Sequence, residues 1–432
     1  RPHAGDYPDV HWRALTREQL RQHPHYVSLP EQPSQPIRTA ADYPLIPQCS
    51  EAWEALHRGR LTTSTAASCL GFYEPSAAKL LGIPRGLAGR ERASNAFLRL
   101  RTGPPPGGYE AAASKALAAE AEAAAGAAAA AAAVAAGMGS AKASEKFSME
   151  ANREAERSPW VSHKQPGSQQ AGSFALQLEP VHQAGGISRR RRRHYHSSTA
   201  VRLDWGSAQE ASALLAVVNH LYYSGRCGES GPGRNARGDL FLCEVGMYCG
   251  GPLDPARLDD VWLGASPDAV LCRKEGSMAV VEVKNRSPFY DAGKQRRGRG
   301  AAAAGGRFGL RDEGPGTTLG TWHVPQLMLH MHCAGVNEAW LLNLSATRGA
   351  ALLLLRRDDA YLAEMLYFMR EFVEKFVRTG RAPKPDFFAD LPRYKTFLHR
   401  TRRLAAAAML VRVFEHPEVQ RAGGPSDSLF LD

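Results

Sequence analysis

The amino-acid sequence lacks any apolar run of the length that a membrane span requires, and it has no pair of cysteines in a CxxC spacing. The first absence argues against a membrane-spanning helix, which needs about 20 consecutive apolar residues. The seven cysteines are odd in number and scattered, which argues against a zinc knuckle and favours reduced thiols. We therefore expect an intracellular protein without a membrane partner. Because the sequence starts at Arg1, its compartment stays open between the nucleus and an organelle such as a chloroplast or mitochondrion.

Large apolar side chains are also scarce between about Pro104 and Ser198, where alanine and then polar residues and arginine dominate. A segment of this composition buries too little apolar surface to offset the entropy of ordering it, so we expect a mostly disordered insert over 104–198. Its alanine tract has helical propensity but no amphipathic face for docking. A second flexible insert is expected over 291–319, which is rich in glycine and arginine.

The net charge of +11 comes almost entirely from two basic runs in glycine-rich sequence. Each run carries five positive charges: Arg189–Arg193 in the first, and Lys294, Arg296, Arg297, Arg299 and Arg307 in the second. Such runs suit a polyanionic partner, but solvated loops of biased composition carry the same charge. Both interpretations stay open, so charge alone does not identify a partner.

Apolar periodicity and turn residues predict an α/β chain in the order helix, sheet, helix, sheet, helix. One helix is expected to begin after the N-cap Ser50, a short one near Thr63, and a long one to end at Gly225. Three consecutive strands are predicted in residues 239–249, 262–272 and 277–285. A helix in 322–335, strands in 338–344 and 350–357, and a helix over Tyr361–Arg378 follow.

These elements and inserts divide the sequence into five parts. We expect an extended arm (1–47), the first part of the main folded domain (48–103), the disordered insert (104–198), the core of that domain (199–395), and a C-terminal helix and tail (396–432). The main domain is therefore expected to be assembled from segments on both sides of the insert.

The most informative segment, GASPDAVLCRKEGSMAVVEVKN, carries Asp268 on one predicted strand and Glu282 with Lys284 on the next. Depending on the length of the hairpin loop, Asp268 faces Val281 or Glu282. Facing Cβ atoms are roughly 4.5–5.5 Å apart, which is close enough for two carboxylates to share a metal ion. Because side chains alternate along a strand, Glu282 and Lys284 share one face, while Val281 and Val283 point into the core.

Two carboxylates at this separation repel each other unless a cation lies between them, and one of them tends to keep its proton. Oxygen ligands without a nearby cysteine or histidine suit Mg²⁺ or Mn²⁺. In phosphodiester hydrolysis such an ion polarises a phosphoryl oxygen, lowers the pKa of a bound water and offsets charge on the leaving oxygen. Lys284 would orient that water or help to deprotonate it, and the sequence does not decide which.

Asp268, Glu282 and Lys284, with the literal Pro267–Asp268, resemble the PD-(D/E)xK nuclease signature. Three further segments occur in the order found in lambda exonuclease and the YqaJ-type viral recombinase nucleases, and they are similar to motifs of that family: WEALHRGRLTTS, DWGSAQEASAL and VPQLMLHM. The resemblance implies the restriction-endonuclease-like α/β fold, a central mixed β-sheet flanked by helices. It also implies a magnesium-dependent DNA nuclease, a 5′-to-3′ exonuclease on duplex DNA in recombination or repair.

The same resemblance assigns the site residues. The implied catalytic residues are Glu210, Asp268, Glu282, Lys284 and Gln326, and the implied metal ligands are Glu210, Asp268, Glu282 and Val283. Ser64 is expected to bind the DNA 5′ phosphate, with Arg58 or Arg60 adding charge, because a hydroxyl and free amides at a helix start form an anion site. His57 replaces a family arginine, and Met328 replaces a second family glutamine. For Trp53 and Leu56 we favour ordinary core packing.

The implied partners are the ends of double-stranded DNA, a single-strand annealing recombinase, and further copies of this chain. No feature of the sequence specifies a number of copies. A catalytically weak DNA-binding or recombination scaffold and a structure-specific endonuclease are the alternatives. The joint presence of Glu210, Asp268, Glu282 and Lys284 argues against a scaffold that has lost its active site.

Overall fold

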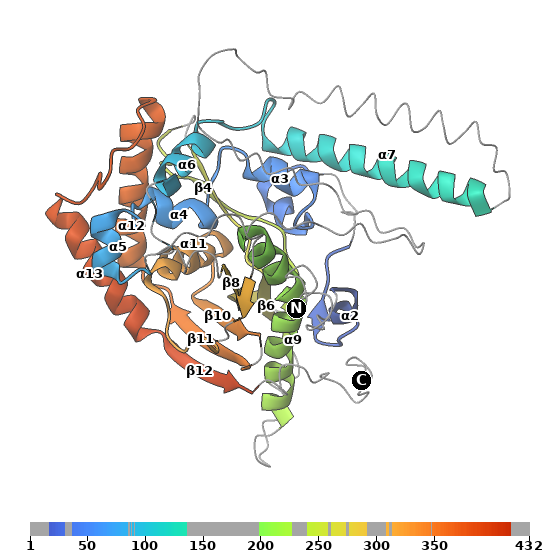
Figure 1. The fold of residues 1–432 in the computed structure, drawn as a ribbon. Helices are drawn as coiled ribbons and strands as arrows, with labels where there is room; N and C mark the ends of the chain where they lie inside the picture. Colours follow the sequence, from blue (N-terminus) through green and yellow to red (C-terminus); the bar gives the residue numbers. More distant parts are fainter. Residues whose placement is uncertain are drawn as a thin grey trace, which may run out of the picture. The chain divides into compact units, whose positions relative to one another are not determined.

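The computed structural model describes residues 17–30, 37–84, 87, 89, 91–135, 198–226, 240–257, 261–273, 276–291, 308–310, 313–346 and 348–415. Contacts divide the chain into two units, one formed by 1–119 with 194–432 and the other by 120–193. The first unit is an α/β fold built on a mixed seven-stranded sheet with helices against it (Figure 1). In the second unit the described residues, 120–135, are helical. The α/β class and the mixed sheet agree with the sequence prediction.

The main sheet has the strand order β1-β3-β6-β7-β10-β11-β12. The pairs β1/β3 and β7/β10 are parallel, and the other pairs are antiparallel. The long strand β7 lies at the centre of the order. The bounds are β1 (Tyr26–Val27), β3 (Phe241–Cys243), β6 (Ala269–Arg273), β7 (Gly276–Arg286), β10 (Glu338–Ser345), β11 (Ala350–Arg356) and β12 (Met409–Phe414).

The other strands form two smaller sheets. One contains β2 (Leu61–Thr62), β5 (Trp262–Ala265) and β4 (Tyr248–Pro252), and in the other β8 (Phe289–Asp291) pairs with β9 (Phe308–Leu310). The prediction of one strand in 239–249 and one in 262–272 was therefore wrong, because each run forms two strands that belong to different sheets. Pro267 has no N–H to continue a ladder, and a Cβ on Gly246 would lie 2.1 Å from the Ile46 carbonyl oxygen. Both positions interrupt the runs.

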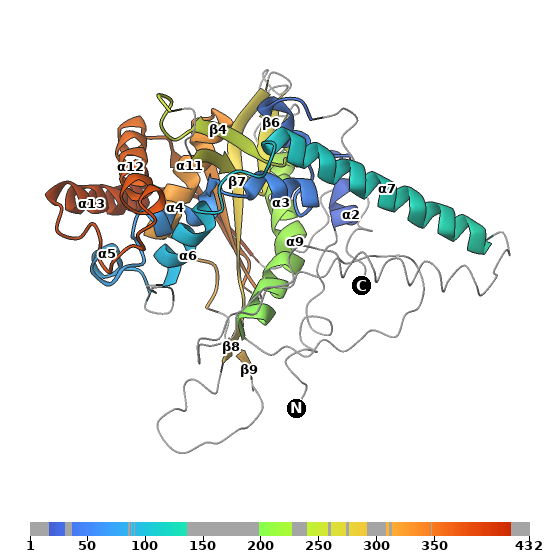
Figure 2. The same cartoon turned by 90° about the horizontal axis from the view of Figure 1, so that it is seen from above.

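Helices lie on both sides of the main sheet (Figure 2). One side carries the long helix α9 (Ser198–Arg226) and the short α2 (Arg17–Arg21). The other side carries α4 (Thr63–Cys69), α5 (Pro75–Leu81), α6 (Glu91–Leu100), the 3₁₀ turn η4 (Thr321–His323) with α11 (Val324–Ala334), α12 (Asp359–Phe372) with the π-helical turn η5 (Val373–Arg378), and α13 (Pro392–Ala407). None of the helices in the described part of the chain is long and apolar enough to cross a membrane.

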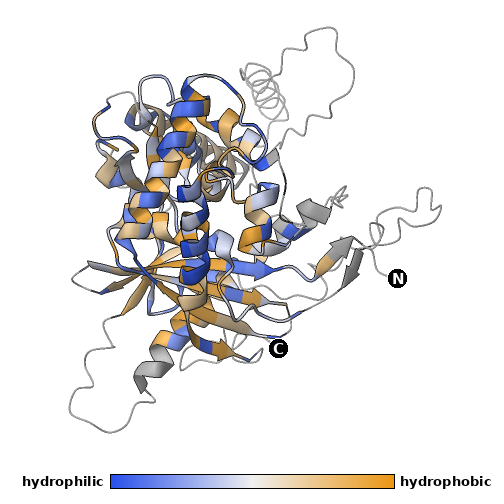
Figure 3. Ribbon diagram, turned by 90° about the vertical axis from the view of Figure 1, so that its left-hand side faces the viewer, coloured by the Kyte–Doolittle hydropathy of each residue, from blue (hydrophilic) through white to orange (hydrophobic). Residues whose placement is uncertain are grey.

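Alternation along β7 divides the apolar core between the two sides. Ala279, Val281 and Val283 pack with α9, whereas Val280 packs with α11 and the helices around it. Much of the main sheet is accordingly coloured as hydrophobic in Figure 3. Glu282 and Lys284 are polar residues on the α11 side, as the predicted alternation requires.

A third cluster joins segments that the sequence analysis separated. It contains Ile37, Tyr43 and Ile46 near the 3₁₀ helix η2 (Ala40–Leu45), Ala52 and Leu56 of α3 (Glu51–His57), Met247, and Tyr109 and Ala113 of α7 (Tyr109–Ala135). The Ser50 Oγ accepts from the Trp53 N–H and caps α3 as predicted. Leu56 is a core residue, which agrees with the prediction of core packing.

The boundaries of the expected flexible segments need correction. The described part of 1–47 is not an extended arm: it includes α2, η2 and a strand of the main sheet, with Leu20 fully buried. The insert expected over 104–198 is helical at 109–135 because Tyr109 and Ala113 dock into the third cluster. The tail expected after 396 supplies β12. Residues 136–197, 292–307, 311–312 and 416–432, with both basic runs, lie outside the described residues.

Candidate active site

The β6–β7 hairpin brings Asp268 and Glu282 to adjacent strands. Ala269 pairs with Val281, and the register shifts by one residue between Leu271 and Cys272. Extending this register places Asp268 opposite Glu282, which is the second of the two predicted arrangements. The Val283 N–H donates to Asp268 Oδ2 at 2.6 Å and fixes the aspartate at the start of β6.

Glu282 is almost fully buried, and three side chains contact its carboxylate. The ammonium of Lys284, two residues further along β7, forms an ion pair with Oε1. Gln326 Nε2 donates to the same oxygen at 2.6 Å, and His330 Nε2 lies 3.0 Å from Oε2. Gln326 and His330 both come from α11, one turn apart, so that helix supplies one wall of the site.

Glu210 comes from α9 on the other side of the sheet. Asn285 Nδ2 donates to the Gly206 carbonyl at 2.6 Å and holds the first half of α9 beside the end of β7. The Glu210 carboxylate forms an ion pair with the guanidinium of Arg17, which also contacts Glu244 at 3.0 Å. Arg17, which the sequence analysis left without a role, therefore carries the positive charge bound to Glu210.

The carboxylates influence one another electrostatically. Burial and the nearby charges of Glu282 and Glu210 raise the pKa of Asp268 well above its ordinary value. Burial would also raise the pKa of Glu282, but Lys284 and His330 outweigh it and lower that pKa to about 2. Asp268 is therefore the group whose negative charge is least well compensated by the protein.

The basic groups at the site also show opposing effects. Burial lowers the pKa of Lys284, but Glu282 and Asp268 more than offset this, so its pKa is raised and the ammonium is charged at neutral pH. Burial, reinforced by the charge of Lys284, lowers the pKa of His323 to about 3. His323 is consequently a neutral imidazole at the start of α11.

The donor set has the chemistry of a hard divalent cation: three carboxylates, of which Asp268 lacks full compensation. In the described part of the chain, however, no three His, Cys, Asp or Glu side chains are arranged to hold a metal ion. The contacts explain why, since Arg17 is bound to Glu210, and Lys284 with Gln326 is bound to Glu282. The residues thus fit Mg²⁺ or Mn²⁺ by type, provided that Glu210 is released from Arg17.

The predicted phosphate-binding residues have three different environments. Ser64 is exposed near the start of α4, with its hydroxyl 3.0 Å from that of Thr62. Arg58 is half-buried at the end of α3, and its carbonyl accepts from the Tyr109 hydroxyl at 2.9 Å. Phosphate binding by Ser64 and Arg58 stays a prediction.

The assignment of Arg60 to DNA was wrong. Its side chain is fully buried, and its guanidinium lies 3.7 Å from the centre of the Tyr109 ring, with Tyr43 and Trp262 within 6 Å. Its Nη1 donates to Cys249 Sγ at 3.1 Å. A guanidinium held among aromatic rings is stabilised by cation–π attraction and cannot reach a phosphate. Arg60 instead packs inside the third cluster, against the rings of Tyr43 and Tyr109.

Two residues outside the predicted set support the turn before Asp268. Gln48 Nε2 donates to the Pro267 and Val245 carbonyls, each at 2.8 Å. Trp53 is half-buried and packs against the third cluster, in agreement with the prediction of core packing, and its indole N–H donates to Ser266 Oγ at 3.0 Å. Its ring packs on His57 at 3.8 Å between centroids. Segments far apart in the sequence therefore fix the backbone that presents Asp268.

Sequence reasoning missed Arg17, His323 and His330. For His330 a signal was available, because it follows Gln326 by four residues and so shares its helix face. No comparable signal existed for Arg17, since its contact with Glu210 joins segments on opposite sides of the long insert. The role of Val283 as a ligand stays a prediction, although its N–H does hold Asp268.

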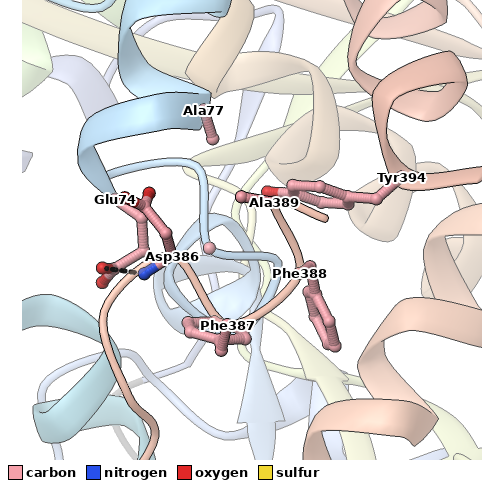
Figure 4. A pocket seen from close by; sticks show the side chains of 8 residues that line it. Glu74, Ala77, Asp386, Phe387, Phe388, Ala389 and Tyr394 are labelled. Carbon is pink, nitrogen blue, oxygen red and sulfur yellow. Dashed lines mark hydrogen bonds between the residues drawn. The ribbon is translucent and has the colours of Figure 1, made fainter. Parts of the chain in front are cut away.

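A small pocket elsewhere has a structural explanation. Figure 4 shows it between the start of α5 and the segment before α13, lined by Gly71, Glu74, Ala77, Asp386, Phe387, Phe388, Ala389 and Tyr394. Glu74 Oε2 accepts from the Asp386 N–H at 3.0 Å, and Asp386 Oδ1 accepts from the Ser76 N–H at 2.9 Å. These bonds fasten the two segments together, and the pocket contains none of the predicted site residues.

No protein-family model matches the sequence, and no curated protein matches it. A solved structure that does match is the crystal structure of an alkaline exonuclease (LHK-Exo) from Laribacter hongkongensis. The sequence identity is 14%, the match covers 48% of this chain and 74% of that chain, and the TM-score is 0.21. Values this low establish neither a shared family nor a shared fold.

Proposed function

We propose that this protein is a Mg²⁺- or Mn²⁺-dependent DNA nuclease. The observation that supports this most strongly is the half-buried Asp268 opposite a Glu282–Lys284 pair, with Glu210 from one side of the sheet and Gln326 from the other. A structural role alone does not account for placing these carboxylates next to one another, because each raises the energy of its neighbour's charge. The finer assignment, 5′-to-3′ digestion of duplex DNA in recombination or repair, is supported by the sequence resemblance.

Asp268, Glu282 and Glu210 would hold the cation, together with the backbone at Val283. When bound, the cation supplies charge neutralisation and a water of lowered pKa for attack on a phosphodiester. Burial and the charges of Glu282 and Glu210 raise the pKa of Asp268, and the cation would offset those charges. The positive charges of the described residues compensate the carboxylates of the site only in part, so a bound cation would supply the missing positive charge.

The chain's own residues have distinct roles in this proposal. Lys284, whose ammonium forms an ion pair with Glu282, would orient the attacking water or contact a phosphate oxygen. Gln326 neither gains nor loses a proton and holds Glu282 by its amide. Val283 keeps Asp268 in place through its N–H.

The test is cleavage of an end-labelled linear duplex in Mg²⁺ or Mn²⁺ by purified full-length protein. Asp268→Asn and Lys284→Met are expected to reduce the rate by at least about 100-fold, as loss of a group acting at the reacting centre does. Asp390→Asn and Lys79→Met, which change exposed residues of the same types, serve as matched controls and should retain the wild-type rate. Equal rates for the wild type and both site variants would refute the proposal.

A covalently closed circular duplex separates exonuclease from endonuclease activity. An exonuclease leaves the circle intact and degrades it once it is linearised. Cleavage of the closed circle as fast as the linear duplex would reject the exonuclease assignment while keeping the hydrolytic chemistry. The predicted phosphate contact of Ser64 is tested by digesting linear duplexes with 5′ phosphate or 5′ hydroxyl ends with the wild type and with Ser64→Ala. The wild type should prefer the 5′ phosphate ends, and Ser64→Ala should lose this preference.

A further inference from the structure

His330 is a fully buried histidine in the face of α11 that packs against β7. It follows Gln326 by one helical turn, so the two side chains approach opposite oxygens of Glu282. Gln326 Nε2 is 2.6 Å from Oε1, and His330 Nε2 is 3.0 Å from Oε2. Their neighbours Leu327 and Met331 are core residues, which makes His330 a polar exception in an apolar stretch.

Core packing does not account for an imidazole at this position. A buried polar group without a hydrogen-bond partner costs about 1–3 kcal/mol, and leucine or methionine would fill similar space without that cost. In the described part of the chain neither ring nitrogen of His330 makes an aligned hydrogen bond, and Glu282 is the carboxylate in contact with the ring. His330 is therefore placed to form a hydrogen bond with Glu282, although in this structure the two side chains make only a short contact without hydrogen-bond alignment.

The contacts of Glu282 determine how it can bind a cation. A carboxylate offers about four lone-pair sites, two on each oxygen. Lys284 and Gln326 both donate to Oε1, whereas His330 Nε2 lies 3.0 Å from Oε2 without an aligned hydrogen bond. Oε2 is therefore the less engaged oxygen, and Glu282 is set up to bind a cation through it.

We propose that His330 is a positioning residue that fixes Oε2 of Glu282 for a divalent cation without binding the cation itself. This inference rests on the proposed function and adds a residue outside the expected ligand set. Outer contacts of this kind are worth about 10- to 100-fold in metal affinity or activity. Loss of the contact should therefore weaken cation binding while the DNA-binding surface is unchanged.

The experiment measures Mn²⁺ binding to the full-length protein by electron paramagnetic resonance of the free ion. His330→Met removes the polar contact at similar volume, and His330→Gln returns an N–H donor near the position of Nε2. The matched control is His332→Gln, two residues further along the same helix and so on another face. We expect at least about 10-fold weaker Mn²⁺ binding in His330→Met, near wild-type binding in the other two variants, and a lower kcat with unchanged KM for DNA in His330→Met.

Each outcome bears on one proposal. If Mn²⁺ binds equally to the wild type and to Asp268→Asn, or if it binds to neither protein, the proposed function fails. If binding depends on Asp268 but His330→Met binds like the wild type, only the role of His330 is overturned. A ¹⁴N coupling of a bound imidazole in the wild-type Mn²⁺ complex that is lost in His330→Met would also overturn it, because His330 would then be a ligand. Should thermal unfolding show that His330→Met does not fold, a 10-fold loss in a folded His330→Gln variant overturns it instead.

Discussion

Arg17→Ala is expected to strengthen the binding of divalent cations. Arg17 neutralises Glu210 through an ion pair, and it also contacts Glu244 at 3.0 Å. A cation that uses Glu210 must displace this guanidinium, so the free energy of the Arg17–Glu210 pair opposes cation binding.

The magnitude follows from the exposure of the pair. The Arg17 side chain is 36% exposed and that of Glu210 is 22% exposed, so solvent screens their attraction. A pair of this kind is worth about 0.5–1 kcal/mol, which corresponds to about 2- to 5-fold tighter Mn²⁺ binding in the variant. Added salt weakens the same pair, so the difference between the variant and the wild type should shrink as ionic strength rises.

Titration of free Mn²⁺ by electron paramagnetic resonance at two salt concentrations measures this effect. Arg21→Ala is the matched control, because Arg21 lies on the same helix and contacts Glu244 at 3.7 Å. It should leave Mn²⁺ affinity near the wild-type value. Unchanged or weaker Mn²⁺ binding by a folded Arg17→Ala variant would refute the competition between Arg17 and the cation.

Three further predictions test the surrounding structure. Burial lowers the pKa of His57 to about 4, so its neutral form stabilises the fold above its unfolded pKa of about 6.5. That stability, up to about 3 kcal/mol, is lost as the pH falls toward 4. In urea titrations, the free energy of unfolding of His57→Gln should therefore fall less over this pH range than that of the wild type. An equal fall in both proteins would contradict the lowered pKa of His57. Arg60→Met should leave the salt dependence of DNA binding unchanged, because Arg60 is fully buried; a slope smaller by about 0.9 would return it to the phosphate-binding set. Gly59→Ala should lower the free energy of unfolding by more than about 2 kcal/mol, because Gly59 has a φ of +67° and a Cβ there would lie 2.2 Å from the Gly103 oxygen; wild-type stability in a urea titration would contradict this packing.

The sequence predicted the centre of the candidate site because that part depends on local rules. Alternation along β7 separates Glu282 and Lys284 from Val281 and Val283 in any half-buried strand. The choice between Val281 and Glu282 as the residue facing Asp268 could not be made, because a one-residue bulge at Met278 in β7 decides it: Leu271 pairs with Ala279, and Cys272 pairs with Ser277. Such a bulge depends on the turn and on neighbouring strands.

Long-range packing accounts for what the sequence did not predict. Arg60 lies in a basic motif, and its contacts with Tyr43, Tyr109, Trp262 and Cys249 make it a core residue. The first turns of α7 dock into the third cluster through Tyr109 and Ala113, with Ala116 and Leu117 packed against it, although the alanine tract has no amphipathic pattern. Likewise, residues of β1 and β12 read as arm and tail because their strands are defined by partners far along the chain. Propensity and periodicity contain no information about these partners.

The positions of β1 and β12 at the two edges of the main sheet determine how the chain tolerates trimming. Removing residues 1–36 or 409–432 as dispensable ends would strip a border strand and expose unpaired N–H and C=O groups of β3 or β11. Uncovered strand borders recruit other chains, so a shortened protein would tend to aggregate even with every side chain of the candidate site intact. A soluble fragment of this enzyme candidate therefore has to extend from before Tyr26 to beyond Phe414.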